Sequence, residues 1–159
     1  MYTRIHKEGT VLRLILILSL VGLAVSGYLT YVHYNRAEGV CPIGGGCSDV
    51  WDSEYSVVFG IPVALIGLLG YIALFGMSYL RLYYPDLGIA ENFPTYMLLI
   101  SIIGAAFSIY LTLIEIFVIQ AICDWCFTAF LVMMAILGLL AYGILKGRDE
   151  KPAAEPVAT

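Results

Sequence analysis

The sequence predicts an all-α integral membrane protein, a bundle of four transmembrane helices with an extracytoplasmic loop between the first and the second. Hydrophobic residues make up 61% of the 159 positions, and the mean hydropathy is +0.91. A soluble domain of this size cannot bury so much apolar surface. The apolar residues form four continuous runs of about the length that crosses a bilayer, roughly 20 residues. These runs lack period-2 alternation, and backbone in lipid must satisfy its own hydrogen bonds, so helices are expected.

The four runs extend over residues 11–34, 57–84, 93–120 and 123–145. The first is too long, and too poor in a small-residue cleavage site, for a signal peptide, so we expect a retained helix. One membrane domain is expected over residues 1–147. Residues 148–159 are rich in Ala, Pro and Glu and are expected to form a disordered cytoplasmic tail.

The basic residues predict the orientation of the bundle. Seven of the eight Lys and Arg residues flank the termini or the second connection, and only Arg36 lies in the first. The positive-inside rule then places both termini in the cytoplasm. The loop 35–56 and the turn 120–122, and with them all four cysteines, are expected on the outer face. We expect a multi-pass protein of a prokaryotic plasma (inner) membrane, or of the endoplasmic reticulum membrane in a eukaryote.

The net charge of −4 comes from clustered charges and includes no basic stripe. Nucleic acid is therefore excluded as a partner, and membrane lipid is the expected surrounding. The sequence contains no Rossmann fingerprint, haem motif or flavin signature. Any redox chemistry must then use the cysteines, without a flavin.

The pair Cys123-Asp124-Trp125-Cys126 lies where the fourth helix is expected to begin. Unpaired N–H groups and the helix dipole favour a thiolate there, and the thiolate is the form that attacks disulfides. Asp124 partly opposes this effect. A zinc site is disfavoured because His33 is the only nearby imidazole, so no metal is expected.

The second pair, Cys41 and Cys47, encloses three consecutive glycines that give the loop backbone freedom. One interpretation is a static disulfide that fixes the outer loop. The favoured interpretation is thiol–disulfide exchange between the two pairs, which moves electrons two at a time. The relay needs a terminal acceptor, and a quinone dissolved in the membrane can meet an outward CxxC without a soluble cofactor.

A weak internal echo relates the two halves of the chain. Ser26-Gly-Tyr-Leu-Thr30 resembles Ser108-Ile-Tyr-Leu-Thr112, and a cysteine follows each after the same interval. Either a duplication or chance similarity between apolar helices explains it.

These residues resemble the vitamin K epoxide reductase family, especially its short prokaryotic members. The matching features are the loop cysteine pair, the segment from Cys47 to Ser56, Phe59-Gly-Ile-Pro62 and the CxxC that opens the last helix. The resemblance covers about residues 10–146. It implies a four-helix bundle around a quinone of the menaquinone, vitamin K or ubiquinone type, used as co-substrate.

The resemblance also implies roles for the cysteines. Cys41 would exchange with the thiols of a partner, Cys47 with the CxxC, Cys123 would be the resolving cysteine and Cys126 would face the quinone. Because the chain stops at Thr159 without a thioredoxin-like domain, that partner is expected to be a separate thioredoxin-like protein, similar to DsbA. The implied quinone-binding positions are Trp51, Tyr55, Ser56, Phe59, Val63, Ala64, Leu111, Glu115, Ile119 and Phe130.

Two of these positions differ from the vertebrate members. Ser56 replaces an Asn and keeps a hydroxyl, whereas Phe130 replaces a Tyr and has no hydrogen-bond donor. Quinone reduction is therefore favoured over epoxide reduction.

Three of these side chains have equally simple structural explanations. Glu115 lies inside a predicted span, where it either serves the reaction or extends to the interface. Trp51 and Tyr55 either cover the quinone or belong to an interfacial aromatic belt.

The leading hypothesis is a thiol:quinone oxidoreductase that supports disulfide formation outside the cytoplasm. The alternatives are a vertebrate-type epoxide and quinone reductase, and a non-catalytic tetraspan protein with structural disulfides. A bacterial B-type quinone reductase has its two cysteine pairs in the opposite order. A transporter is disfavoured because polar midplane segments are nearly absent.

Overall fold

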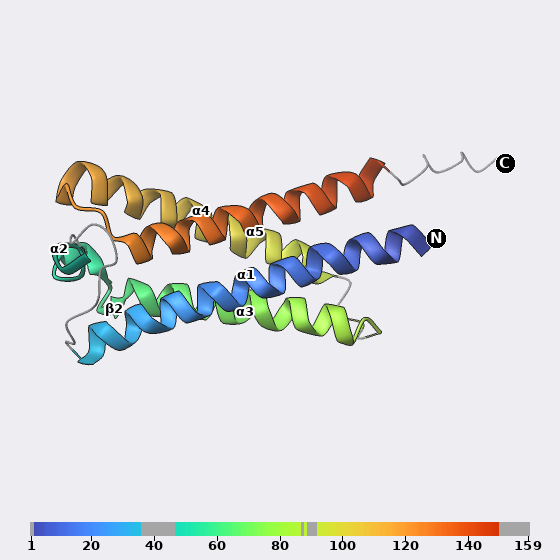
Figure 1. The fold of residues 1–159 in the computed structure, drawn as a ribbon, viewed down its shortest axis with the longest axis horizontal. Coiled ribbons are helices and arrows are strands. Elements are labelled where there is room, and N and C mark those ends of the chain that lie inside the picture. The colour runs from blue at the N-terminus through green and yellow to red at the C-terminus, as the bar shows by residue number, and fades with distance from the viewer. Residues whose placement is uncertain (1, 36–46, 87, 89–91, 150–159) are drawn as a thin grey trace.

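The computed structural model describes residues 2–35, 47–86, 88 and 92–149, with side chains from residue 9 to residue 145. Its long helices are α1 (Tyr2–Asn35), α3 (Val63–Tyr83), α4 (Phe93–Ile114) and α5 (Asp124–Asp149). They lie side by side as one elongated bundle (Figure 1). All four are long and apolar enough to cross a membrane, which confirms the predicted four-helix fold.

The two termini lie at the same end of this bundle (Figure 1). The opposite end carries the short helix α2 (Cys47–Trp51), the turn η1 (Glu54–Ser56) and the start of α5. We call it the cysteine end, because the described residues Cys47, Cys123 and Cys126 all belong to these elements or directly precede them. Which side of the membrane this end faces stays a prediction.

The predicted start of the second span, at residue 57, is wrong. Strands β1 (Val57–Val58) and β2 (Ile61–Pro62) form an antiparallel hairpin, and α3 begins only at Val63. The two residues between the strands, Phe59 and Gly60, have φ values of 53° and 80°. Positive φ at both central residues is the geometry of a type I′ turn, one of the two turns that two-residue hairpins favour.

The predicted third span changes its winding before it ends. The α-helical part α4 stops at Ile114, and a π-helical turn, η3 (Glu115–Ile119), continues it. Gln120 then adopts a left-handed conformation with φ of 56°, which ends the helix. Single π-helical turns of this kind occur often at functional sites.

Helix α5 extends to Asp149, two residues beyond the expected domain boundary. Residues 150–159 lie outside the described part of the chain, so the disordered tail stays a prediction.

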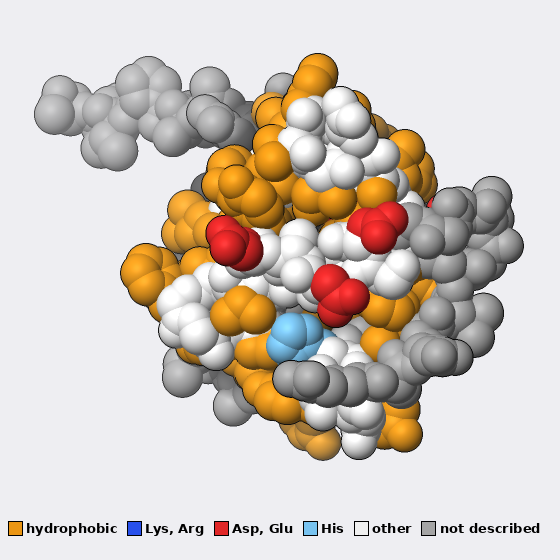
Figure 2. All heavy atoms as spheres, turned by 90° about the vertical axis from the view of Figure 1, so that its left-hand side faces the viewer, with side chains coloured by type: hydrophobic (Ala, Val, Ile, Leu, Met, Phe, Trp, Pro, Cys, Tyr) orange, Lys and Arg blue, Asp and Glu red, His pale blue; other side chains and the backbone are white. Residues whose placement is uncertain are grey.

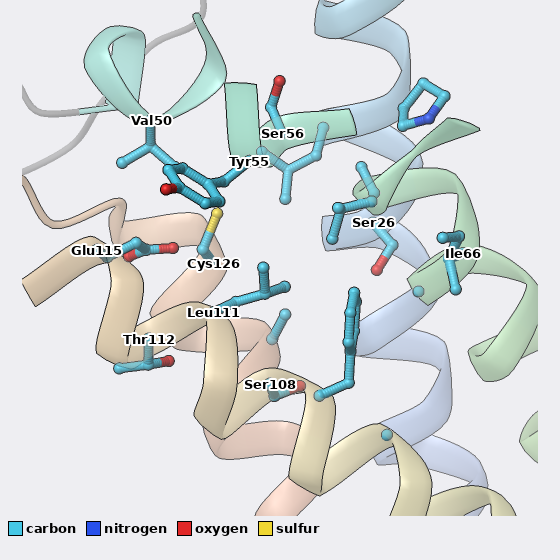
Figure 3. Close-up of a pocket in the computed structure, with 18 of the residues that line it drawn as sticks. Ser26, Val50, Tyr55, Ser56, Ile66, Ser108, Leu111, Thr112, Glu115 and Cys126 are labelled. Atoms are coloured by element: carbon cyan, nitrogen blue, oxygen red, sulfur yellow. The ribbon is translucent and has the colours of Figure 1, made fainter. Parts of the chain in front are cut away.

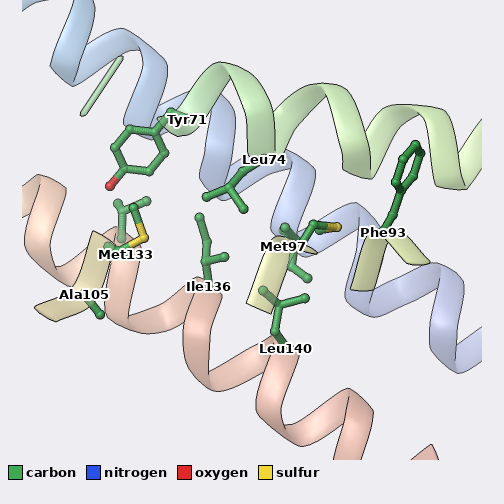
Figure 4. Close-up of a cluster of buried hydrophobic side chains, with 10 residues drawn as sticks. Tyr71, Leu74, Phe93, Met97, Ala105, Met133, Ile136 and Leu140 are labelled. Atoms are coloured by element: carbon green, nitrogen blue, oxygen red, sulfur yellow. The ribbon is translucent and has the colours of Figure 1, made fainter. Parts of the chain in front are cut away.

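Buried apolar side chains fill the half of the bundle nearer the termini. Figure 4 shows Leu74, Met97, Ile136 and Leu140 meeting there from α3, α4 and α5, and Ile15 of α1 belongs to the same cluster. The bundle interior and the lipid are similarly apolar, so the hydrophobic effect does not drive the helices together. Their association depends instead on close packing of this kind. The other half of the bundle, towards the cysteine end, is packed less completely and contains the cavity described below.

Tyr71 of α3 joins three helices at the boundary between the two halves. Its ring packs against Gly22 of α1, where any Cβ atom would overlap it. Its hydroxyl donates a hydrogen bond of 2.7 Å to the carbonyl oxygen of Ala129 in α5.

Candidate redox site

A buried cluster at the cysteine end brings two distant cysteines together. Cys47 at the start of α2 and Cys123 just before α5 are 1% and 0% exposed, and both belong to one apolar cluster with Val50. Trp51 and Trp125 are among the side chains that pack against it. Cys47 is disulfide-bonded, whereas Cys123 and Cys126 are free thiols. Cys41 lies outside the described residues.

The π-helical turn shapes the approach to the CxxC. The carbonyl oxygen of Glu115 accepts hydrogen bonds from the backbone N–H groups of Gln120 and Ala121, the latter at 3.2 Å. The chain is thereby folded back so that one carboxylate oxygen of Glu115 accepts a hydrogen bond of 3.3 Å from the backbone N–H of Cys123. A side chain from the third span thus contacts the residue that opens the fourth.

The two thiols of the CxxC are coupled by hydrogen bonds. The backbone N–H of Cys126 donates to the sulfur of Cys123 at 3.3 Å. A hydrogen bond from the Cys126 thiol to the Cys123 sulfur lowers the pKa of Cys123 below its ordinary value. Burial and the charge of Glu115 act in the opposite direction but do not cancel this effect. Cys123 is therefore the cysteine whose thiolate is stabilised.

A cavity of about 310 Å³ lies beside the cluster and is lined mainly by apolar side chains from all four long helices. Figure 3 shows Cys126 and Glu115 on one wall, with Val50, Tyr55 and Ser56 near one end and Ser108 further away. Cys126 lines this cavity, whereas Cys123 is not among the described residues that do. Cys126 also packs against the cluster that holds Cys47 and Cys123, so the two cysteines differ in that, of the pair, only Cys126 reaches the cavity.

The model of the vitamin K epoxide reductase family matches residues 13–141. The chain belongs to this family. A thiol-disulfide oxidoreductase of Arabidopsis thaliana, LTO1, is 44% identical over 54 residues, which are 33% of this chain and 14% of that protein. The chain thus matches only a small part of that relative's length. Together the family and this relative support a membrane oxidoreductase.

In this vitamin K epoxide reductase family member, most of the predicted quinone positions meet at the cavity. Those that line it are Trp51, Tyr55, Ser56, Val63, Ala64, Leu111, Glu115 and Ile119. They come from η1, α3, α4, η3 and the end of α2, so the fold gathers residues that are up to 68 positions apart in the sequence, from 51 to 119.

Phe59 and Phe130 do not line the cavity, contrary to expectation. Phe59 is fully exposed, because it occupies the tip of the hairpin and points away from the bundle. Phe130 packs against Phe127, with ring centroids 5.9 Å apart. The side of α5 that faces the cavity presents Cys126, Ala129 and Met133 at helical spacing, and Phe130 lies beside that stripe.

Several polar residues of the cavity were not predicted. Ser26, His33, Ser108 and Thr112 all line it. Three of them belong to the internal echo of the sequence, in which Ser26 of α1 and Ser108 of α4 correspond. This internal similarity was therefore the feature of the sequence that could have indicated Ser26, Ser108 and Thr112 as cavity residues. His33, considered from the sequence only as a zinc ligand, has its ring edge-on to that of Tyr34.

Acidic side chains lie on the cysteine end of this family member. Figure 2 looks onto the cysteine end and shows acidic groups and a histidine on it, with no Lys or Arg among the described atoms in view. Asp49, Asp52 and Glu54, all exposed, belong to α2 and the segment that follows it. This end therefore presents negative charge outside the hydrocarbon region.

Proposed function

We propose that this chain is a membrane thiol:quinone oxidoreductase that oxidises the dithiol of a thioredoxin-like partner and reduces a quinone. The observation that carries the proposal is the difference between the two CxxC sulfurs. Cys123 shares a buried cluster with disulfide-bonded Cys47, whereas Cys126 lines an apolar cavity. One sulfur is thus available to the loop and the other to a molecule in the bundle.

The proposed relay has two exchanges of thiols with disulfides. A thiolate of the partner attacks the loop disulfide, which we assign to Cys41 and Cys47, and the partner leaves with its own disulfide. The thiolate of Cys47 then attacks Cys123 in the Cys123–Cys126 disulfide, and Cys41 displaces Cys123 from Cys47. Each exchange breaks one S–S bond and forms another, so that the electron pair moves to the CxxC.

The last step transfers that electron pair to the quinone. The two S–H bonds of Cys123 and Cys126 break, one S–S bond forms, and the quinone takes up two electrons and two protons to become a quinol. In this step Cys126 acts at the cavity wall, and Cys123, whose thiolate is stabilised, closes the disulfide.

The cavity suits a quinone headgroup in shape and polarity. It is enclosed by apolar side chains, with a small number of polar groups, which is the usual composition of small-molecule sites. The indole N–H of Trp51 lies buried in this wall without a hydrogen-bond partner among the described residues. A buried N–H without a partner is unfavourable, and a quinone carbonyl would accept its hydrogen bond once the indole ring turned this N–H into the cavity. Menaquinone, vitamin K and ubiquinone all present such carbonyl groups.

The surface and the basic residues support an outward orientation of the cysteine end. Arg13 and Arg81 lie towards the end that carries the termini, and the positive-inside rule places that end in the cytoplasm. The partner would then meet the acidic cysteine end in the space outside the cytoplasm, where disulfides persist.

The test measures quinol formation by the purified full chain in lipid nanodiscs, supplied with a reduced thioredoxin-like protein and a menaquinone or ubiquinone analogue. We expect steady turnover in the wild type and none in Cys126→Ala. Phe127→Leu is the matched control, because Phe127 neighbours Cys126 but is exposed outside the cavity, and it should keep the wild-type rate. Turnover in Cys126→Ala equal to that of the wild type would contradict the proposal.

A further inference from the structure

Glu115 is the only buried charged side chain among the described residues, with 5% of its surface exposed. It lies at the start of η3, within the third membrane-spanning segment. An ionisable group at this depth is unfavourable unless it has partners, and most such groups serve a function. Its partners therefore indicate what it does.

The contacts of Glu115 join both cysteines of the CxxC to the cavity. One carboxylate oxygen accepts the backbone N–H of Cys123 at 3.3 Å. The Cys126 thiol lies within hydrogen-bonding reach of the same carboxylate, which is an alternative acceptor to the Cys123 sulfur for its one proton. The same side chain lines the cavity, and Figure 3 shows it directed towards the same region as Cys126.

A purely structural role accounts for only one of these contacts. The bond to the N–H of Cys123 satisfies a donor at the beginning of α5, where negative charge is also favoured by the helix dipole. A helix cap requires neither a reactive thiol within hydrogen-bonding reach nor a position on the cavity wall. The carboxylate lies beside the atom that must lose a proton and on the wall of the space where a proton must be delivered.

We propose that Glu115 is the proton carrier of the quinone-reducing step. The inference rests on the proposed function. The carboxylate takes the proton of the Cys126 thiol, and the sulfur then forms the S–S bond with Cys123 as the electron pair passes to the quinone. Glu115 gives that proton to a quinone oxygen and is a carboxylate again. The second proton of the quinol is the one released by the Cys123 thiol, so electrons and protons balance.

The kinetic test compares Glu115→Gln with Glu115→Asp in the nanodisc assay. Gln keeps the side-chain length and an oxygen to accept the N–H of Cys123, but it cannot carry a proton. We expect kcat to fall roughly 100-fold or more in Glu115→Gln, the usual size of a lost general acid–base, with KM for the quinone little changed. Asp should restore part of the loss. Asp86→Asn, an exposed acid at the opposite end of the bundle and outside the cavity lining, is the matched control and should behave as the wild type.

A wild-type rate in Glu115→Gln would overturn the proton role while the wild type still reduces quinone. A wild type that reduces no quinone would instead overturn the proposed function.

Infrared difference spectra between the oxidised and dithiol forms, recorded without quinone, test the proton role independently. We expect a carboxyl band that changes on reduction of the Cys123–Cys126 disulfide, shifts in D₂O and is absent in Glu115→Gln. Spectra without such a band would overturn the inference. The same measurement decides the case in which the Gln and Asp variants are equally slow.

Discussion

Cys123 and Cys126 are only three positions apart, yet their side chains have different neighbours. Cys123 precedes α5 and packs with Cys47 and Val50, whereas Cys126 lies one turn further and faces the cavity. The backbone N–H of Cys126 and its thiol both approach the Cys123 sulfur. In the proposed relay, this difference separates the sulfur that exchanges with the loop from the sulfur that meets the quinone.

The burial pattern predicts which disulfide can be trapped. With Cys41→Ala and Cys126→Ala combined, Cys47 and Cys123 remain in one cluster, and mild oxidation should join them in nearly all molecules. With Cys41→Ala and Cys123→Ala combined, Cys47 and Cys126 should join far more slowly. Non-reducing peptide mapping by mass spectrometry measures both yields. Equal yields would show that the two sulfurs are not separated as described.

The coupling between the thiols predicts a pH dependence for Cys123. Because its pKa is lowered, the thiolate persists to a pH below the ordinary midpoint of about 8.5. The exchange rate should fall only when the pH drops through that lower midpoint. Removal of the donor in Cys126→Ala should raise the midpoint, and Cys126→Ser, which keeps a hydroxyl donor, should raise it less.

Thiolate absorbance measured against pH, in a background with Cys41→Ser and Cys47→Ser, follows this ionisation. Midpoints in the Ala and Ser variants equal to that of the background that keeps Cys126 would exclude the Cys126 side chain as the cause.

Much of the site follows from the sequence, but two aromatic positions do not. The resemblance indicates Trp51, Tyr55, Ser56 and five further positions on α3, α4 and η3, and the structure places them around one cavity. Phe59 and Phe130 fail because side-chain direction depends on the turn at Gly60 and on the phase of α5. Neither is fixed by hydropathy or by motif spacing.

At the scale of elements, hydropathy predicts the existence of each span better than its winding. Residues 57–62 are as apolar as the helix that follows, so they appear as part of the second span, yet they form a hairpin. The hydrogen bond between Glu115 and Cys123 was equally hidden, because it depends on the π-helical turn and on left-handed Gln120. The hairpin and the π-helical turn depend on how side chains pack at the cysteine end, and amino-acid composition does not specify them.

The contact between α1 and α3 predicts a strong effect of one methyl group. In Gly22→Ala the new Cβ would overlap the ring of Tyr71, so we expect a loss of about 1–3 kcal/mol in the free energy of unfolding, typical of overpacking. Gly76→Ala, on α3 with nothing within 4 Å of the new atom, is the matched control and should not lower stability. Thermal unfolding in detergent measures both, and equal melting temperatures would contradict the close contact.

The whole molecule divides into two functional halves along its length. The half towards the termini is packed with apolar side chains (Figure 4), and the half towards the cysteines holds the cavity (Figure 3). Sequence alone predicts the number of helices and their order along the chain. It does not predict this division, because interior and lipid-facing positions are similarly apolar.

The predicted orientation can be tested on intact cells. In a variant without native cysteines, Asp52→Cys marks the cysteine end, and Asp86→Cys marks the opposite end; both positions are exposed. A membrane-impermeant maleimide should label Asp52→Cys in intact cells, but Asp86→Cys only after the membrane is permeabilised. The reverse pattern would mean that the cysteine end faces the cytoplasm.

The burial of Cys47 and Cys123 in one apolar cluster has a consequence for fidelity. Val50, Trp51 and Trp125 pack around both sulfurs and shield them from the surrounding solution. In the proposed relay, small thiols in the surrounding solution cannot reach the sulfur of Cys47 or Cys123 directly. They therefore do not exchange with these two cysteines in competition with the transfer to the quinone. In Val50→Ala, the smaller side chain should expose Cys47 and Cys123, so that glutathione exchanges with them even while quinone reduction continues.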